Sequence, residues 1–262
     1  MPVRVQNALE RATSAYELTV NGITFQTPYW INSSGGGFRM NAPFRGKATA
    51  GQLTVAAGRI AERASSTPET GEEYRVLLRR AGYGVDCSGF TYHVLQEHLR
   101  AKGLGPLSRY LYLTREDLAG AIERFPERTS LDDLMSPYTM ESVCRRWHKY
   151  PPHYTNVQRL ISSDATVDVP CAGDITEGDL IKLTGTAGDD HIVVVLRRDG
   201  NQVSYAQSVF EVNSLGGVVT RVLTISHPKL GLEHQDFPDM QIYKPEIGDS
   251  VRRLRVLNDG TT

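Results

Sequence analysis

The sequence predicts an α+β protein in which helices come first and an antiparallel β-sheet follows. In the first part of the chain, apolar side chains recur at the three- and four-residue spacing of amphipathic helices. From Gly178 onward they gather in short runs rich in β-branched residues, with turn residues between the runs. This switch of period indicates helices packed on a later sheet, and we expect residues 1–262 to form a single domain.

The helices are expected in four segments before residue 104. They are the amphipathic N-terminal stretch, about 49–64, 72–80, and the segment that begins at Cys87 and ends at Lys102-Gly103. Asn21-Gly22 marks a turn followed by strand-like residues, and SSGGG at 33–37 opens a loop. Two further segments, REDLAGAIERF and SLDDLMSPYTMESVCRRWHKY, also carry helical spacing.

The strands are expected after the last of these helices. The candidate runs, in order, are GDLIKL, HIVVVLRR, QVSYAQSVFEV, GVVTRVLTI, QIYKP and VRRLRVL. The sequence RRDGN between the second and third runs contains Asp-Gly, a hairpin turn signal. The second and third runs are therefore predicted to be antiparallel neighbours.

Composition excludes several classes of function. The formal net charge is -1 and the basic residues are scattered, so no broad positive field indicates nucleic acid or an anionic membrane as partner. No window reaches the 18 or so apolar residues of a membrane span. The three cysteines do not suggest a disulfide framework, and the N-terminal residues lack the apolar core of a secretion signal. We expect a cytoplasmic protein, or one exported by a non-classical or dedicated route.

Cys87, in GYGVDCSGF, is a candidate nucleophile. If Asp86 caps the following helix, the sulfur lies beside exposed backbone N–H groups at the positive end of the helix dipole. That position favours the thiolate and offers donors to an oxyanion. The other interpretation, a small buried hydrophobe, is equally compatible with the position alone.

His191 is the strongest candidate for the base that a nucleophilic cysteine needs. It opens the apolar run HIVVVL directly after the loop TGTAGDD, and a titratable residue at the mouth of a buried strand indicates a site. His93 and His98 lie on the Cys87 helix, which carries them away from the thiol. The other four histidines lie in polar, turn-rich segments.

The base needs an orienting partner on the returning strand. Because side chains alternate, an odd hairpin loop puts Gln207 and Tyr205 on the face of His191, and an even loop puts Ser208 and Ala206 there. Gln207 has a carbonyl oxygen that can accept the imidazole N–H. Tyr205 and Ser208 remain open as alternatives.

DCSGF, GDLIKL and HIVVVL, in this order and followed by a returning strand with a polar residue, resemble the NlpC/P60 cysteine peptidases. The resemblance implies a papain-like α+β fold in which the nucleophile helix packs on an antiparallel sheet. It also implies hydrolysis of amide bonds in bacterial cell-wall peptides. By this resemblance Cys87 is the nucleophile, His191 the general base and Gln207 the polar third member.

The same resemblance implies a substrate-binding group. Asp86 and Ser88 flank the nucleophile as in family members that use them to hold the free amine of a peptide. Tyr29, in TPYWIN, matches an upstream tyrosine that lines the site, although it lies 58 positions before Cys87. The segments 33–81 and 104–172 exceed the compact family pattern and are expected to be helical insertions that form a lid or a wall.

The expected partner is a peptidoglycan stem peptide or muropeptide, with no cofactor. CRRWHKYPPH carries Cys144, His148 and His153, but their spacing, even with Cys171, matches no common zinc pattern, so we predict no metal site. Two alternatives stay open: a papain-like deamidase or acyltransferase acting on a protein or lipid, and a non-catalytic binding module.

Overall fold

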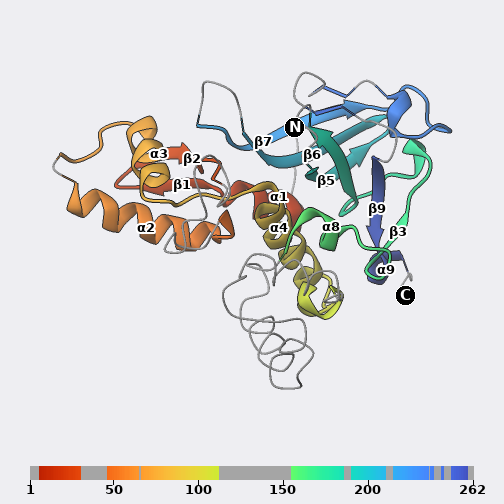
Figure 1. Ribbon diagram of the computed structural model, residues 1–262, viewed down its shortest axis with the longest axis horizontal. Coiled ribbons are helices and arrows are strands. Elements are labelled where there is room, and N and C mark those ends of the chain that lie inside the picture. Colours follow the sequence, from red (N-terminus) through yellow and green to blue (C-terminus); the bar gives the residue numbers. More distant parts are fainter. Residues whose placement is uncertain are drawn as a thin grey trace, which may run out of the picture.

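The fold is a mixed α+β arrangement, as predicted, with one central antiparallel sheet and helices on one side of it (Figure 1). The computed structural model describes residues 6–30, 46–64, 66–111, 155–185, 190–210, 215–235, 237–238, 243–244 and 249–258. The two predicted helices within 115–150 lie outside these residues.

The sheet has seven strands in the order β3-β9-β4-β5-β6-β7, with β8 paired to β4. Their bounds are β3 Thr166–Asp168, β4 Leu180–Gly185, β5 Asp190–Asp199, β6 Gln202–Val209, β7 Gly217–Thr224, β8 Tyr243–Lys244 and β9 Ser250–Leu254. All six predicted runs contribute a strand, and all the pairings are antiparallel. The run VRRLRVL is strand only to Leu254, because α9, Arg255–Asn258, takes over there.

A polar N-cap residue precedes each of the five helices named next. They are α1 Ala8–Ser14, α2 Ala50–Arg63, α3 Gly71–Arg80, α4 Cys87–Ala101 and α8 Val157–Leu160, with short 3-10 turns at 107–109, 172–174 and 232–234. Asn7, Thr49 and Thr70 each close a capping box, in which the cap side chain and the third helical residue satisfy each other's backbone N–H. The starts of α2, α3 and α4 lie within a residue of those predicted from the sequence, whereas α8 was not predicted.

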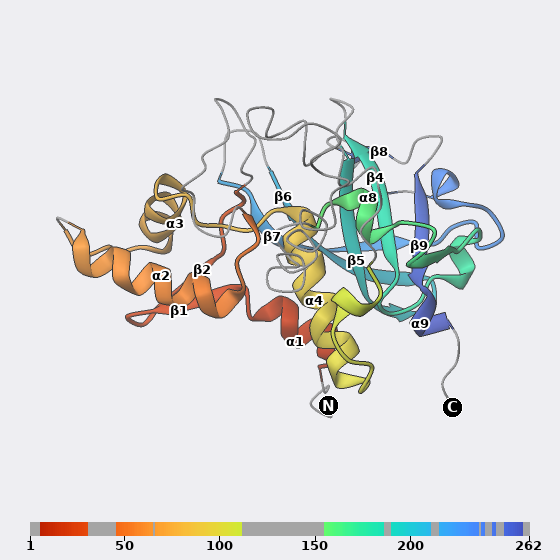
Figure 2. The same cartoon turned by 60° about the horizontal axis from the view of Figure 1, so that its bottom comes forward.

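The N-terminal segment differs from the prediction of one amphipathic helix. Helix α1 ends at Ser14, and ELTV forms β1, Glu17–Val20, which pairs with β2, Ile23–Gln26. Asn21 and Gly22 connect the strands with φ angles of 51° and 79°, as the tight hairpin turns that match strand twist require. The hairpin lies beside α2 and α3, away from the main sheet (Figures 1 and 2).

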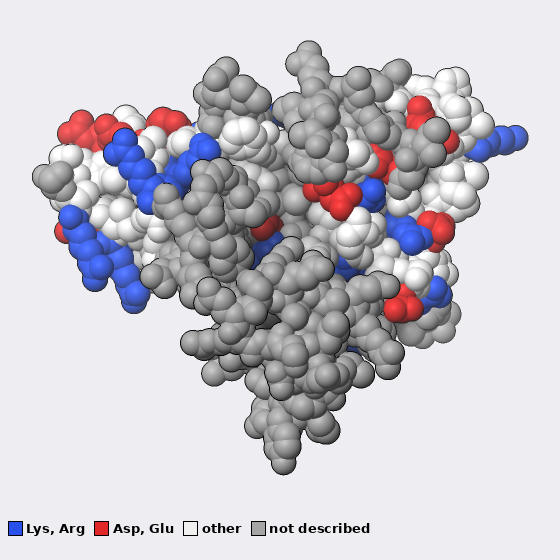
Figure 3. Space-filling model, viewed as in Figure 1, with Lys and Arg blue, Asp and Glu red and all other residues white. Residues whose placement is uncertain are grey.

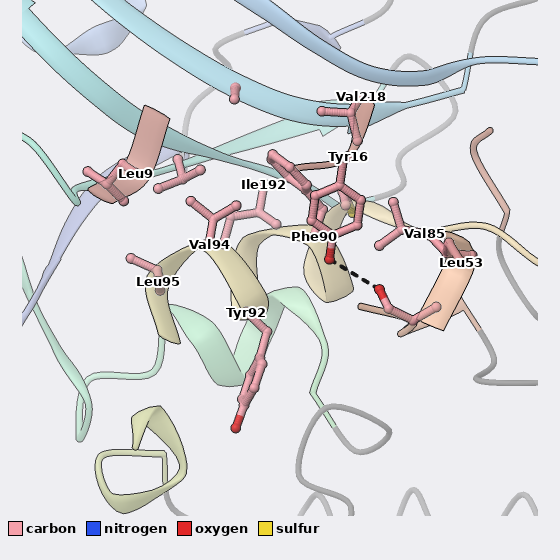
Figure 4. Close-up of a cluster of buried hydrophobic side chains, with 14 of the residues drawn as sticks. Leu9, Tyr16, Leu53, Val85, Phe90, Tyr92, Val94, Leu95, Ile192 and Val218 are labelled. Atoms are coloured by element: carbon pink, nitrogen blue, oxygen red, sulfur yellow. Dashed lines mark hydrogen bonds between the residues drawn. The ribbon is translucent and has the colours of Figure 1, made fainter. Parts of the chain in front are cut away.

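Helix α4 packs on one face of the sheet and forms the larger core. Phe90, Val94 and Leu95 from the helix meet Ile192 from β5 (Figure 4), and Val194 of β5 belongs to the same core; none of the five is measurably exposed. A second core lies on the opposite face of the sheet, where the rings of Tyr205 and Phe237 stack with centroids 5.0 Å apart. Burial on both faces explains why β5 reads as an unbroken apolar run.

Part of the segment 104–172 belongs to the sheet. Strand β3 pairs with β9, with Thr166 opposite Leu254, and helix α8 packs against α4 and β5. Strand β3 was not predicted, because three residues are too short to show alternation.

Asp179, in the GDL sequence, fixes the start of β4. Its carboxylate is fully buried and accepts hydrogen bonds from Arg253 Nε (2.7 Å) and Nη2 (2.8 Å), and from the Thr176 N–H (2.7 Å). Burial raises the pKa of Asp179, and the bonds from Arg253 and Thr176 oppose that rise. Asp179 therefore joins the start of β4 to β9 through a bidentate ion pair.

The surface carries charges of both signs. Figure 3 shows Lys and Arg interspersed with Asp and Glu over the described residues of one face. In the part of the chain that the structure describes, no helix combines the length and apolar character needed to cross a bilayer.

Candidate active site

Cys87 is the first residue of α4, and Asp86 is the N-cap, as predicted. The Asp86 carboxylate accepts from the Gly89 N–H at 2.7 Å, and its carbonyl accepts from the Phe90 N–H. The cap fixes the direction in which the helix leaves, and so the position of the thiol. The Cys87 side chain is mostly buried, with 7% of the residue exposed.

The residues before Cys87 are held from three sides. Val85 forms isolated β-bridges with Tyr29 on one side and Lys47 on the other. Its carbonyl oxygen also accepts a hydrogen bond from Ser208 Oγ at 2.7 Å. The fold thus brings Tyr29 close to Val85, two residues before Cys87, although Tyr29 and Cys87 are 58 positions apart in the sequence.

The thiol sits where β5 and β6 separate. Their ladder ends at the pair Val194 and Ala206, after which β6 continues on β7 alone and β5 on β4. The backbone N–H of Ile192 is hydrogen-bonded to the Cys87 sulfur in this opening. The nucleophile candidate therefore touches the backbone of the residue that follows His191.

His191 and Gln207 bridge the same opening. His191 Nε2 and Gln207 Oε1 are 2.6 Å apart, and the two residues are 2% and 0% exposed. The predicted contact between His191 and Gln207 is present. Of the two alternatives, Tyr205 stacks on Phe237 in the second core, and the Ser208 hydroxyl binds the Val85 carbonyl.

A β-bulge selects Gln207. Asp199 pairs with Gln202, so the hairpin loop has two residues, and an even loop alone would have put Ser208 on the face of His191. Between Val195 and Arg197 the register shifts by one residue. Beyond this bulge the side chains of Gln207 and His191 lie on the same face of the sheet.

Lys47 completes the surroundings of the nucleophile, and no pattern in the sequence pointed to it. Its ammonium group contacts Asp86 Oδ1 at 2.7 Å and Ser88 Oγ, and only 8% of the residue is exposed. A Cβ at Gly89 would lie 2.5 Å from the Gly46 carbonyl oxygen and 2.9 Å from Lys47 Cδ. Gly89 in DCSG thus leaves room for the segment that carries Lys47.

The expectation of a stabilised thiolate is corrected by the burial of the site. Burial, followed by the negative charge of Asp86, raises the pKa of the Cys87 thiol to about 12. Lys47 and the N–H groups of Ile192 and Ser88 act in the opposite direction and do not offset the loss of water. Cys87 is therefore a neutral thiol at pH 7 and needs a base to react.

The raised pKa predicts how alkylation of Cys87 depends on pH. Only the thiolate reacts, so the rate is expected to rise about tenfold per pH unit from about pH 6 to about pH 10 without a plateau. Iodoacetamide labelling followed by peptide mass spectrometry measures this rate. A short unstructured peptide with one cysteine, whose labelling rate levels off above the ordinary thiol pKa of about 8.5, is the control. A plateau for Cys87 below about pH 8 would show a stabilised thiolate instead.

The remaining candidates lie elsewhere. His93 Nε2 contacts the Lys47 carbonyl oxygen at 2.9 Å, and burial lowers the pKa of His98 to about 4. His227 and His234 are exposed. Cys144, His148 and His153 lie outside the described residues, and the described ones contain no group of three or more His, Cys, Asp or Glu suited to a metal ion.

Comparison with protein families, with curated proteins and with solved structures finds no match to this chain.

Proposed function

We propose that the protein is a cysteine peptidase that hydrolyses amide bonds in bacterial cell-wall peptides, with Cys87 as nucleophile, His191 as base and Gln207 as its orienting partner. The observation that carries the proposal is the buried His191–Gln207 pair at 2.6 Å, held on two strands at the opening that receives the Cys87 sulfur. The choice of cell-wall peptides rests on the resemblance of DCSGF, GDLIKL and HIVVVL to NlpC/P60 peptidases.

The proposed reaction proceeds through a thioester. His191 takes the thiol proton as the Cys87 sulfur attacks the amide carbonyl carbon, and the C–N bond then breaks as His191 returns that proton to the leaving amine. His191 next removes a proton from a water molecule that attacks the thioester, which releases the carboxylic acid and restores the thiol. Because Gln207 engages Nε2, Nδ1 is the nitrogen that exchanges these protons.

The oxyanion would be stabilised at the start of α4. The Gly89 and Phe90 N–H groups are bound by Asp86 and the Ser88 N–H by the Cys87 sulfur, so the N–H group of Cys87 is the candidate donor at this helix end. Tyr29 lies beside the approach to Cys87, and its ring centroid is 6.0 Å from that of the exposed Phe210. These two rings are the proposed aromatic wall for the peptide.

The test is cleavage of purified muropeptides by the unaltered chain and by Cys87→Ala, read by mass spectrometry. We expect a fragment that gains one water across a broken amide bond and is lost in Cys87→Ala. Cys171→Ser, which removes a half-buried cysteine that contacts the Lys229 carbonyl, is the matched control and should keep the fragment. Undiminished turnover by Cys87→Ala would refute the mechanism. Loss of ammonia from a protein glutamine, with no muropeptide fragment, would indicate a deamidase instead.

A further inference from the structure

The ammonium group of Lys47 lies beside the nucleophile, in contact with the two residues that flank Cys87 in the sequence. It lies against Asp86 Oδ1 and Ser88 Oγ, and the Ser88 hydroxyl is itself 3.1 Å from the same carboxylate oxygen. Asp86 Oδ1 also accepts the Gly89 N–H of the helix cap. This oxygen of Asp86 is therefore fully engaged within the chain.

Burial of the pair makes Lys47 costly to displace, because its removal would leave the charge of Asp86 buried and uncompensated. The side chains of Lys47 and Asp86 are 9% and 6% exposed, and an ion pair so far from water is not exchanged freely for a ligand. The bridge to Val85 and the close passage over Gly89 fix the backbone of Lys47. The charge of Asp86 next to Cys87 is thus balanced from inside the protein.

We infer that Lys47 supplies in cis the cation that Asp86 and Ser88 would otherwise take from a substrate, so that the site acts on peptides whose amino end beside the scissile bond is acylated rather than free. This inference rests on the proposed function and replaces the amine-binding role that the resemblance implies for Asp86 and Ser88. A free ammonium group would find no uncompensated anion beside the thiol and would meet the charge of Lys47. A peptide amide in the same place carries no such penalty.

A charge cycle, in which Lys47 and Asp86 are neutralised singly and together, tests the site without relying on hydrolysis. In a chain whose other two cysteines are replaced by serine, Cys87 is labelled at pH 9 with a cationic and an anionic methanethiosulfonate, and the ratio of the two rates is normalised to that of 2-mercaptoethanol. The ratio cancels changes in the pKa of the thiol. We expect a normalised ratio near one for the parent chain, because the Lys47–Asp86 pair is neutral.

The variants should move this ratio in opposite directions. Lys47→Met leaves Asp86 unbalanced and should favour the cationic reagent by about tenfold, the effect of one unit charge a few ångströms away in a partly screened site. Asp86→Asn, which still caps the helix, should favour the anionic reagent. The double variant should return to about one, and Lys102→Met, at the far end of α4, should change nothing. An unchanged ratio in Lys47→Met would overturn the inference.

Paired peptides extend the test to substrates. Two cell-wall peptides that differ only in a free or acetylated amino end are compared by kcat/KM. The parent chain should cleave the acetylated peptide at least as well, and Lys47→Met should shift the preference toward the free amine by about tenfold. A strong preference of the parent chain for the free amine would overturn the inference. Cleavage of neither peptide, together with the expected charge cycle, would reject the proposed hydrolysis and leave the charge balance at Cys87 standing.

Discussion

His191→Ala is expected to lower kcat/KM for the cleaved muropeptide by about a thousandfold. The Cys87 thiol, with its pKa raised to about 12, is almost entirely protonated at neutral pH, so attack on a carbonyl depends on a base in contact with it. A positioned base of this kind typically contributes a factor of about 10² to 10⁴. Steady-state kinetics on the fragment that defines the reaction measure the loss, and circular dichroism checks that the fold is retained.

The role of Gln207 is tested by combining Gln207→Ala with His191→Ala. Gln207→Ala should lower kcat by about tenfold to a hundredfold with little change in KM, because it orients His191 and does not touch the peptide. In the double variant Gln207→Ala should cost nothing further, since the group it orients is gone. Gln202→Ala, at the exposed end of the same strand, is the control. Losses that multiply in the double variant would show that Gln207 acts independently of His191.

The parts of the site that depend on local bonds were predictable from sequence. Asp86 as N-cap and Cys87 as first helical residue follow from a side chain and the three residues after it. The hairpin that returns β6 beside β5 follows from Asp-Gly between two apolar runs. Whether Gln207 or Ser208 faces His191 did not follow, because it depends on a one-residue bulge within an apolar run that has no distinguishing residue at that point.

Lys47 could not be found from the sequence. It lies 39 positions before Asp86, in a stretch without helical or strand period, and its contacts are made only when the chain folds. The predicted direction of the pKa shift at Cys87 was wrong for a related reason. The helix dipole is a local property that a sequence reveals, whereas the burial that outweighs it depends on the strands that separate around the sulfur.

Arg253→Met is expected to lower the free energy of unfolding by about 3–5 kcal/mol. The change leaves the Asp179 carboxylate fully buried with only the Thr176 N–H of its present partners, and an uncompensated buried charge is far more costly than a lost surface contact. The start of β4 should loosen with it, because Asp179 joins that turn to β9. Urea denaturation followed by tryptophan fluorescence measures the loss.

The neighbouring arginine on the same strand provides the control. Arg252 pairs with Asp168, whose side chain is 71% exposed, and donates from Nε to the Ile161 carbonyl at 3.2 Å, so Arg252→Met leaves no charge buried and should cost only about 1 kcal/mol. Acidification distinguishes the cost of the buried Asp179 charge from the cost of lost packing. Without Arg253 the pKa of the buried Asp179 rises further above its value in the unfolded chain. The folded protein then takes up a proton more readily than the unfolded chain, so Arg253→Met should be less destabilising at about pH 5 than at pH 7. Equal destabilisation at both pH values would mean that lost packing, not the buried charge of Asp179, dominates.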